Sequence, residues 1–179
     1  MIVVTGGAGF IGSAIVWKLN QMGTEDIVIV DELRSGDKWK NLVGLKFIDI
    51  YHKNDFLEMI VNENVPFSFD TLIHMGACSS TTEEDADYLL QNNFRYSKEL
   101  AQYCVKREIR FIYASSAATY GDGTNGYNDE IEKVNELRPL NKYGYSKHLF
   151  DKWIYKMHYY QRVVGLKFFN VYGPNEFHK

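Results

Sequence analysis

The chain of 179 residues has an ordinary globular composition, with 45% hydrophobic and 24% charged residues. This composition excludes a disordered or fibrous chain, and the length suits about one domain with a buried core. A net charge of −3 gives no electrostatic reason to expect nucleic acid or an anionic membrane as a partner.

Strand-like apolar runs alternate with helical patterns along the chain. Helices between successive strands predict βαβ crossovers, and hence an α/β fold with a doubly wound parallel sheet. The polar stretch 122–138 is predicted to be a long loop, and loops of this length are more often functional than idle. The predicted strands cover residues 2–4, 26–30, 45–50, 71–75, 110–114 and 163–169, and the predicted helices cover residues 11–22, 55–64, 83–106 and 140–161.

A glycine-rich turn joins the first predicted strand to the first predicted helix. The segment 5–12, TGGAGFIG, satisfies both the GxGxxG and the GxxGxxG spacing. Glycines here allow a tight turn and let the backbone approach a pyrophosphate, while the helix N-terminus offers free N–H groups to that anion. Asp31 follows Gly12 at the distance expected of a carboxylate that binds a cofactor ribose. These residues predict a dinucleotide site.

The residues near this turn leave the choice between NAD and NADP open. Asp31 favours a free ribose 2′-hydroxyl and hence NAD. Arg34, Lys38 and Lys53 are cations that can hold the 2′-phosphate of NADP. Any single surface lysine, however, is more often simply solvated.

A Tyr-x-x-x-Lys pattern, Tyr143 and Lys147, predicts an acid/base pair on one helix. Positions i and i+4 share a helix face, so the ammonium group is expected to lower the pKa of the phenol toward neutrality. Ser116 follows the fifth predicted strand, where ligands bind in such a sheet, and we expect its hydroxyl to orient a substrate. Ser115 is expected to be structural. A hydrolase built on Ser116 and His148 is disfavoured, because no GxSxG elbow surrounds the serine.

Further segments carry a resemblance to a known family. With them the chain resembles the extended short-chain dehydrogenase/reductase superfamily over its whole length, and within it the enzymes that epimerise ADP-linked heptoses at C6. The resemblance implies a Rossmann-type NAD(P)-binding domain over residues 1–179, with a substrate-binding domain expected beyond residue 179. The segments are TGGAGFIG (5–12), HMGACSSTTE (74–83), NNFRYSKEL (92–100), YASSAATYG (113–121), NKYGYSK (141–147) and FNVYGPNEFHK (169–179).

This resemblance implies an isomerase that converts ADP-D-glycero-D-manno-heptose to ADP-L-glycero-D-manno-heptose, in the supply of the ADP-heptose precursor of the lipopolysaccharide core. A hydride would leave C6 for NADP and return to the opposite face of the resulting ketone. The implied catalytic residues are Tyr143, Lys147, Ser116 and Lys179, of which Lys179 would be the second acid/base. Ser116 and Asn170 are the implied substrate contacts.

The resemblance also implies NADP as the cofactor, with NAD as the alternative. The implied contacts come from the glycine-rich turn, the end of the second strand, two lysines, the segment after the fourth strand and two later helices. They are Gly6, Gly9, Phe10, Ile11, Gly12, Asp31, Glu32, Lys38, Lys53, Met75, Gly76, Ala77, Cys78, Ser79, Asn92, Lys147 and Val171.

Two other functions stay open. A related nucleotide-sugar 4-epimerase or 4,6-dehydratase would share Ser116, Tyr143 and Lys147, although dehydratases usually carry an acidic residue where Ala117 and Ala118 stand here. A non-catalytic dinucleotide-sensing module would not need the Ser/Tyr/Lys set.

The remaining features concern compartment and partners. Cys78 and Cys104 are the only cysteines and have no metal-ligand spacing, so we expect free thiols in a reducing compartment and no metal site. No signal peptide or apolar spanning run is seen, which favours a cytoplasmic protein without membrane contacts. Aromatic residues in the stretch 155–160 are compatible with a homo-oligomer. His74 is expected to be a core residue.

Overall fold

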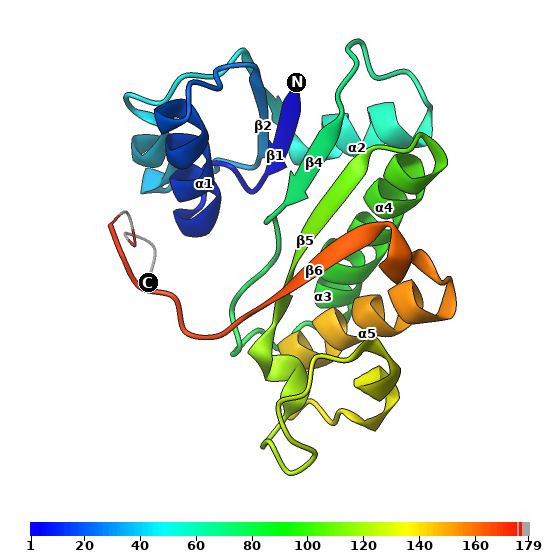
Figure 1. The fold of residues 1–179 in the computed structure, drawn as a ribbon. Helices are drawn as coiled ribbons and strands as arrows, with labels where there is room; N and C mark the ends of the chain where they lie inside the picture. Colours follow the sequence, from blue (N-terminus) through cyan, green and yellow to red (C-terminus); the bar gives the residue numbers. More distant parts are fainter. Residues whose placement is uncertain (175, 177–179) are drawn as a thin grey trace.

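Six parallel strands form one sheet in the computed structural model, which describes residues 1–174 and 176 (Figure 1). Their order across the sheet is β3-β2-β1-β4-β5-β6. The chain therefore builds one half of the sheet outward from β1 and then returns to build the other, which confirms the predicted doubly wound α/β fold. The strands are β1 (Ile2–Thr5), β2 (Ile27–Asp31), β3 (Asp49–His52), β4 (Thr71–His74), β5 (Arg110–Ser116) and β6 (Val163–Phe168).

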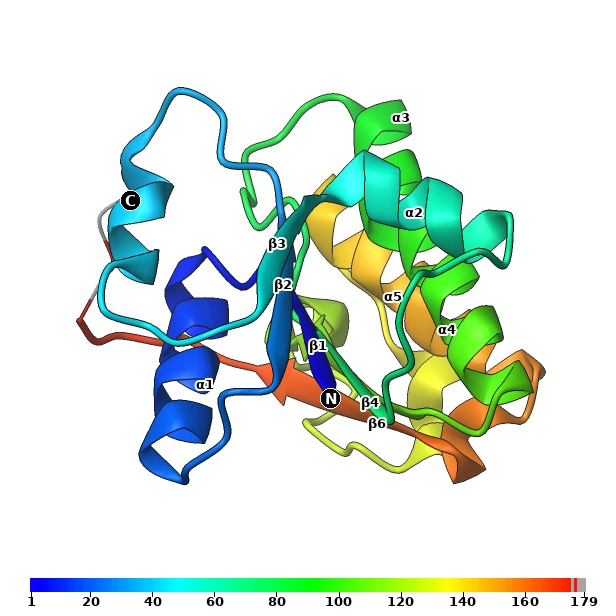
Figure 2. The ribbon, with the colours of Figure 1, turned by 90° about the horizontal axis from the view of Figure 1, so that it is seen from above.

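Helices pack on both faces of this sheet (Figure 2). One face carries α1 (Phe10–Gln21) and a 3-10 helix at Asp37–Leu42, and the other carries α2 (Lys53–Val61), α3 (Ala86–Leu89), α4 (Tyr96–Lys106) and α5 (Lys142–Lys156). A π-helical segment, Leu90–Arg95, joins α3 to α4. Shorter 3-10 helices occupy Ala117–Tyr120, Ile131–Glu136 and Tyr159–Gln161.

The core has two parts, one on each face of the sheet. The larger part lies between the sheet and α2, α4 and α5, and includes Phe56, Leu100, Phe111 and Phe150. The smaller part lies under α1 and is formed by Val4, Val16, Ile27 and Ile29. Strands buried on both faces need apolar residues at every position, which is why β1 and β2 appear as continuous apolar runs in the sequence.

The third strand lies further along the chain than predicted. It covers residues 49–52 instead of 45–50, and it pairs with β2 from Val28↔Asp49 onward. Leu45 and Phe47 instead pack against the core under α1. Their apolar character therefore reports burial outside the strand, which a pattern of residue types cannot distinguish from burial within it.

Two predicted helices also differ in their bounds. The long helix predicted over residues 83–106 begins at Ala86, where Asp85 caps it, and changes to π geometry at residues 90–95. The last helix ends at Lys156, shortly before His158 adopts a left-handed conformation with φ +56°.

Among the residues that the structure describes, no helix is long and apolar enough to cross a membrane. Cys78 and Cys104 are free thiols.

Candidate active site

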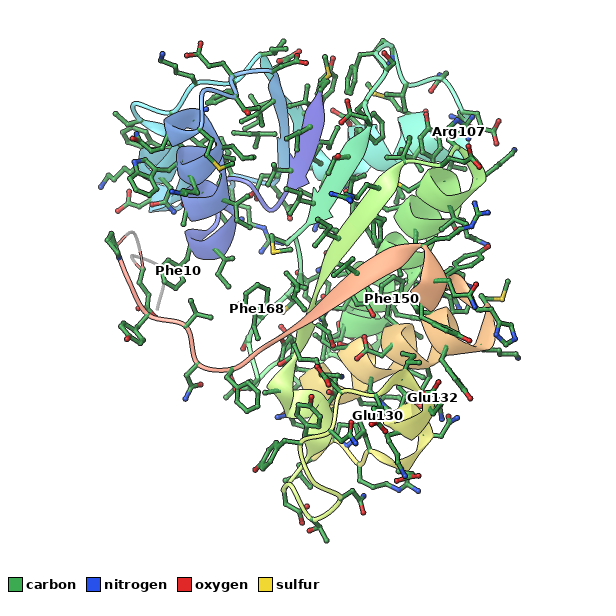
Figure 3. The ribbon with its side chains drawn as sticks, in the orientation of Figure 1. Phe10, Arg107, Glu130, Glu132, Phe150 and Phe168 are labelled. Carbon is green, nitrogen blue, oxygen red and sulfur yellow. The ribbon has the colours of Figure 1, made fainter. Side chains whose placement is uncertain are left out.

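A cavity of about 1080 Å³ opens at the carboxyl ends of the strands. Its walls come from the turn after β1, the end of β2, the segment after β4 and the ends of β5 and β6. Phe10, at the start of α1, and Phe168, at the end of β6, line it from separate elements (Figure 3). The cavity thus occupies the point where the strand order reverses, which is where open α/β sheets bind ligands.

The glycine-rich turn forms the floor of this cavity. A Cβ atom on Gly12 would lie 2.0 Å from the carbonyl oxygen of Gly6, so the first turn of α1 can pack on the loop only if residue 12 is glycine. The first turn of α1 carries no acidic residue, which leaves the positive end of its dipole uncompensated by side chains. Backbone N–H groups at such a helix start suit a phosphate group.

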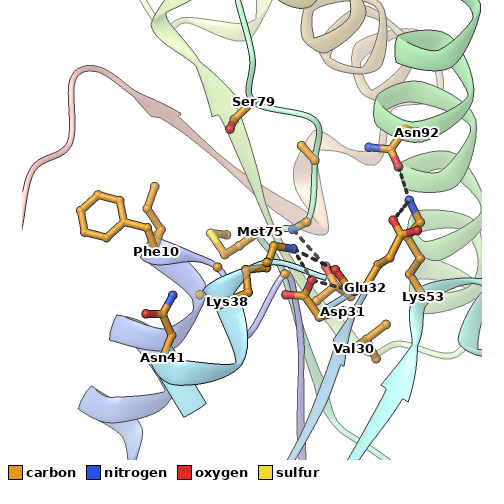
Figure 4. A pocket seen from close by; sticks show the side chains of 18 of the residues that line it. Phe10, Val30, Asp31, Glu32, Lys38, Asn41, Lys53, Met75, Ser79 and Asn92 are labelled. Atoms are coloured by element: carbon orange, nitrogen blue, oxygen red, sulfur yellow. Dashed lines mark hydrogen bonds and ion pairs between the residues drawn. The ribbon is translucent and has the colours of Figure 1, made fainter. Parts of the chain in front are cut away.

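Asp31 fastens the end of β2 to this turn. Its Oδ2 accepts a hydrogen bond from the backbone N–H of Ala8 at 2.8 Å. Its Oδ1 accepts hydrogen bonds from the N–H of Glu32 and from Nζ of Lys38, each at 2.7 Å. Figure 4 shows this contact between Asp31 and Lys38. The carboxylate predicted to bind a ribose therefore holds the glycine-rich turn in shape.

A second chain of charges runs along the cavity wall (Figure 4). Glu32 pairs with Nζ of Lys53 at 2.8 Å and with Arg34 at 3.0 Å, and Lys53 donates to Oδ1 of Asn92 at 3.0 Å. The hydrogen bond from Lys53, followed by that from Arg34, lowers the pKa of Glu32 to about 2. With Asp31, Lys38 and Asp37, the cavity lining carries three cations and three carboxylates, so it has no net positive charge, and an anionic ligand would be held by the individual cations.

The segment after β4 is held by Asn93, a residue that the sequence analysis did not single out. Its side-chain amide binds both the N–H and the C=O of Cys78, at 2.8 and 3.0 Å. Both asparagines lie in the π-helical segment, where Asn92 lines the cavity and donates to Oδ1 of Asn93 at 3.1 Å. The only sequence signal was a pair of amides within an otherwise amphipathic helix.

Ser116 and Tyr143 meet across the cavity from different elements. The Ser116 hydroxyl hydrogen-bonds to the phenol of Tyr143, and its oxygen accepts from the N–H of Ala118 at 3.1 Å. Asn141 caps α5 by accepting from the N–H of Gly144 at 2.7 Å. A Cβ atom on Gly144 would lie 2.7 Å from the carbonyl oxygen of Ala118, so this glycine allows α5 to approach the segment after β5.

The pKa of Tyr143 differs from the sequence expectation. Burial raises it above its ordinary value of about 10, and the hydrogen bond with Ser116 offsets this only in part. Lys147 is not among the groups that shift it. Burial also lowers the pKa of Lys147 to about 8, while Asp151 raises it. The lowering of the phenol pKa that the Tyr-x-x-x-Lys spacing predicts is therefore wrong for this structure, because loss of water around the phenolate dominates.

Comparison with known proteins identifies the chain. The NAD dependent epimerase/dehydratase family matches residues 2–179. The chain belongs to this family. Its members are described as NAD dependent, and the turn, the charged wall and the cavity at the switch point are compatible with a dinucleotide.

Individual relatives of this family are similar over the full chain. The ADP-L-glycero-D-manno-heptose-6-epimerase of Nitratidesulfovibrio vulgaris (strain DP4) is 56% identical over 179 residues, which are 100% of this chain and 55% of the relative. The crystal structure of the Helicobacter pylori enzyme of the same name has a TM-score of 0.80 and 34% identity, covering 98% of this chain and 57% of that one. UDP-glucose 4-epimerase from Brucella ovis in complex with NAD has a TM-score of 0.72 and 27% identity, covering 94% and 51%. The chain thus spans about half the length of these relatives.

The structure brings most of the residues that the sequence predicted for the site to one cavity. The exceptions are Cys78 and Lys147, which do not line it, and Lys179, which lies outside the described residues. The lining residues among those predicted are Gly6, Gly9, Phe10, Ile11, Gly12, Asp31, Glu32, Lys38, Lys53, Met75, Gly76, Ala77, Ser79, Asn92, Ser116, Tyr143, Asn170 and Val171.

Other lining residues were missed, notably Asn41, Thr81, Tyr88 and Tyr96. Asn41 donates to the carbonyl of Ala8 at 2.9 Å and so supports the glycine-rich turn from the 3-10 helix. It lies in no motif, and its role follows only from the packing of that helix.

Two further sequence expectations concern buried polar residues. Ser115 is 3% exposed and donates to Asp151 at 2.7 Å, as suits a structural residue. His74 is 1% exposed, and its ring nitrogens lie 2.6 Å from the Thr5 hydroxyl and 2.8 Å from the Ser97 hydroxyl. The prediction of a core histidine is confirmed.

Among the described residues, no group of three or more His, Cys, Asp or Glu side chains is placed to hold a metal ion.

Proposed function

We propose that this chain binds NADP and carries part of the active site of an enzyme that converts ADP-D-glycero-D-manno-heptose to ADP-L-glycero-D-manno-heptose. The observation that carries the proposal is that Ser116 and Tyr143 line the same cavity as the glycine-rich turn and the charged wall. The proposed substrate is that named for relatives that are 54% to 56% identical to this chain.

The preference for NADP rests on the wall that contains Arg34, Lys38 and Lys53. Each of these cations pairs with Asp31 or Glu32, and all three line the cavity. A 2′-phosphate would find ammonium and guanidinium donors there, which bind phosphate by charge-assisted hydrogen bonds. NAD is the alternative, because Asp31 also suits a free ribose hydroxyl.

The residues of this chain would move a proton while the oxidation state of C6 changes. The bound dinucleotide would supply a hydride acceptor that later returns the hydride. Tyr143 would take the proton of the C6 hydroxyl as the ketone forms, and Ser116 would orient that oxygen through its own hydroxyl. Lys147, one helical turn beyond Tyr143 on α5, is proposed to contact the bound dinucleotide. Lys179 is proposed as the acid/base on the other face of the ketone.

The proposal includes the properties that accompany this activity. They are a role in supplying the heptose of the lipopolysaccharide core, a cytoplasmic location, Asn170 as a substrate contact and assembly into a homo-oligomer. A UDP-sugar 4-epimerase is the second candidate, because solved structures with that name are also similar to this chain.

The decisive experiment offers both substrates to the protein. ADP-D-glycero-D-manno-heptose and UDP-glucose are incubated separately, and NMR follows the configuration at C6 of the heptose and at C4 of the glucose. The dinucleotide that copurifies is released and identified as NADP or NAD. Inversion at C6 alone supports the proposal, whereas inversion at C4 alone would establish the second candidate. A Tyr143→Phe protein is the matched control for any background conversion.

A further inference from the structure

The carboxylate of Asp151 on α5 lies buried against residues of β5 and β6, with 3% of the residue exposed. Its Oδ1 accepts a hydrogen bond from the Tyr113 hydroxyl at 3.0 Å, and its Oδ2 accepts from the Ser115 hydroxyl at 2.7 Å. Nζ of Lys167 lies 2.7 Å from Oδ2 and also donates to the Thr119 hydroxyl at 2.7 Å. Two hydroxyl donors and the ammonium group of Lys167 compensate the cost of burying this carboxylate.

Each element that meets this carboxylate carries part of the proposed active site close by. Ser115 directly precedes Ser116 on β5. Lys167 on β6 precedes the cavity wall at residues 168–171. The carboxylate itself lies one helical turn beyond Lys147 on α5, at the spacing that places both on one face. A shift of this single group would therefore displace all three parts relative to one another.

We propose that Asp151 is a positioning residue for the active site, which holds the ends of β5 and β6 against α5 through Ser115 and Lys167. The inference rests on the proposed function, in which Ser116 on β5 and Tyr143 on α5 act on the same substrate oxygen.

The negative charge of Asp151 should affect the pKa of Lys147, an effect that packing alone would not produce. Asp151 raises the pKa of Lys147 against the lowering caused by burial. It also faces His148 on α5, Lys167 on β6, and Tyr113 on β5. An opposite charge within one helical turn commonly shifts a pKa by about one unit or more. Loss of the negative charge should therefore lower the pKa of Lys147 further.

Two substitutions separate charge from geometry. Asp151→Asn keeps the size of the side chain and removes its charge, whereas Asp151→Glu keeps the charge and adds a methylene group. The pKa of Lys147 is measured in the folded chain by competitive amine labelling and mass spectrometry between about pH 6 and pH 10. We expect Asp151→Asn to lower this pKa by about one unit and Asp151→Glu to leave it nearly unchanged.

Amide hydrogen exchange tests the geometry in the same proteins. Both variants should exchange about tenfold faster at the ends of β5 and β6, with unchanged exchange in β1 and β2. An unchanged pKa of Lys147 in Asp151→Asn, or unchanged exchange at both strand ends, would overturn the proposal. If Asp151→Asn does not fold, the double variant Asp151→Asn/Lys167→Met removes both buried charges and takes its place. No sugar is present in these measurements, so a failure to epimerise the heptose would refute the proposed function without affecting their outcome.

Discussion

The side-chain amide of Asn93 pairs with the backbone of Cys78 on both sides, accepting from its N–H at 2.8 Å and donating to its C=O at 3.0 Å. The same amide nitrogen donates to the hydroxyl of Ser146 on α5 at 3.0 Å. Asn93 is fully buried. One residue thus joins the segment after β4, which lines the cavity, to the helix that carries Tyr143.

Asn93→Ala should lower the free energy of unfolding by about 3 kcal/mol, because it removes two hydrogen bonds to the half-buried backbone of Cys78 and one to Ser146. Urea denaturation followed by circular dichroism measures this loss. Asn93→Asp places a carboxylate at this fully buried position beside the carbonyl of Cys78, so its loss should be at least as large. Asn92→Ala is the matched control on the neighbouring, partly exposed residue and should cost about 1 kcal/mol. Equal losses for the two alanine variants would contradict the role of Asn93.

Tyr143→Phe should reduce epimerisation about 100-fold or more, because it removes the group proposed to transfer the proton. The dissociation constant for NADP, measured by fluorescence titration, should change less than about threefold, since the ring remains. Tyr145→Phe is the control two residues away, where the side chain is exposed. Full activity of the Tyr143 variant would refute the proposed acid/base.

The stability of the fold should decrease in mild acid. Burial lowers the pKa of His74 to about 3 and that of His148 to about 4, below the ordinary value of about 6.5. Below about pH 6.5 the unfolded chain therefore binds protons that the folded chain does not. The free energy of unfolding should fall by about 2 kcal/mol per histidine between about pH 7 and pH 5.

Urea denaturation at several pH values measures this loss. His148→Gln should remove about half of it, because only His74 then remains to titrate in the unfolded chain. If the free energy of unfolding of His148→Gln depends on pH as that of the parent protein does, groups other than His148 cause the loss of stability in acid.

Lys38→Met should discriminate between the two dinucleotides. Lys38 lies 2.7 Å from Asp31, where a 2′-phosphate would approach the wall. Its removal should weaken NADP binding about tenfold and leave NAD binding nearly unchanged, because only NADP carries that phosphate. Lys40→Met is the control on the same 3-10 helix, since Lys40 pairs with Asp37. Equal weakening of both dinucleotides would argue against a phosphate contact.

Gly12→Ala should prevent the observed packing of α1 on the glycine-rich turn. The added methyl group would collide with the backbone of Gly6, which no side-chain rotation relieves, and overpacking of this kind costs about 1–3 kcal/mol. Gly36→Ala is the control, because nothing lies within 4 Å of its added Cβ. Thermal unfolding compares the two, and the Gly12 variant should also lose dinucleotide binding in a fluorescence titration.

The order and type of the main elements follow from local sequence patterns. Continuous apolar runs predict buried parallel strands, and the glycine-rich turn is recognisable because each glycine meets a local steric demand, as at Gly12. The spacing of Tyr143 and Lys147 likewise needs only the geometry of one helix. The location of β3 was predicted less well, because Leu45 and Phe47 are partly buried against the core without belonging to a strand.

The other features of the site depend on contacts between segments that are distant in the sequence. A pattern of residue types does not say which distant segments come into contact. Asn93 reaches the backbone of Cys78, 15 residues earlier in the chain, through the packing of the helix against the segment after β4. Asp151 on α5 contacts Tyr113 on β5 and Lys167 on β6, which are 38 and 16 residues away in the sequence. The pKa of Tyr143 was predicted with the wrong sign because spacing on a helix reports a neighbouring charge, whereas desolvation depends on everything that the folded chain packs around the phenol.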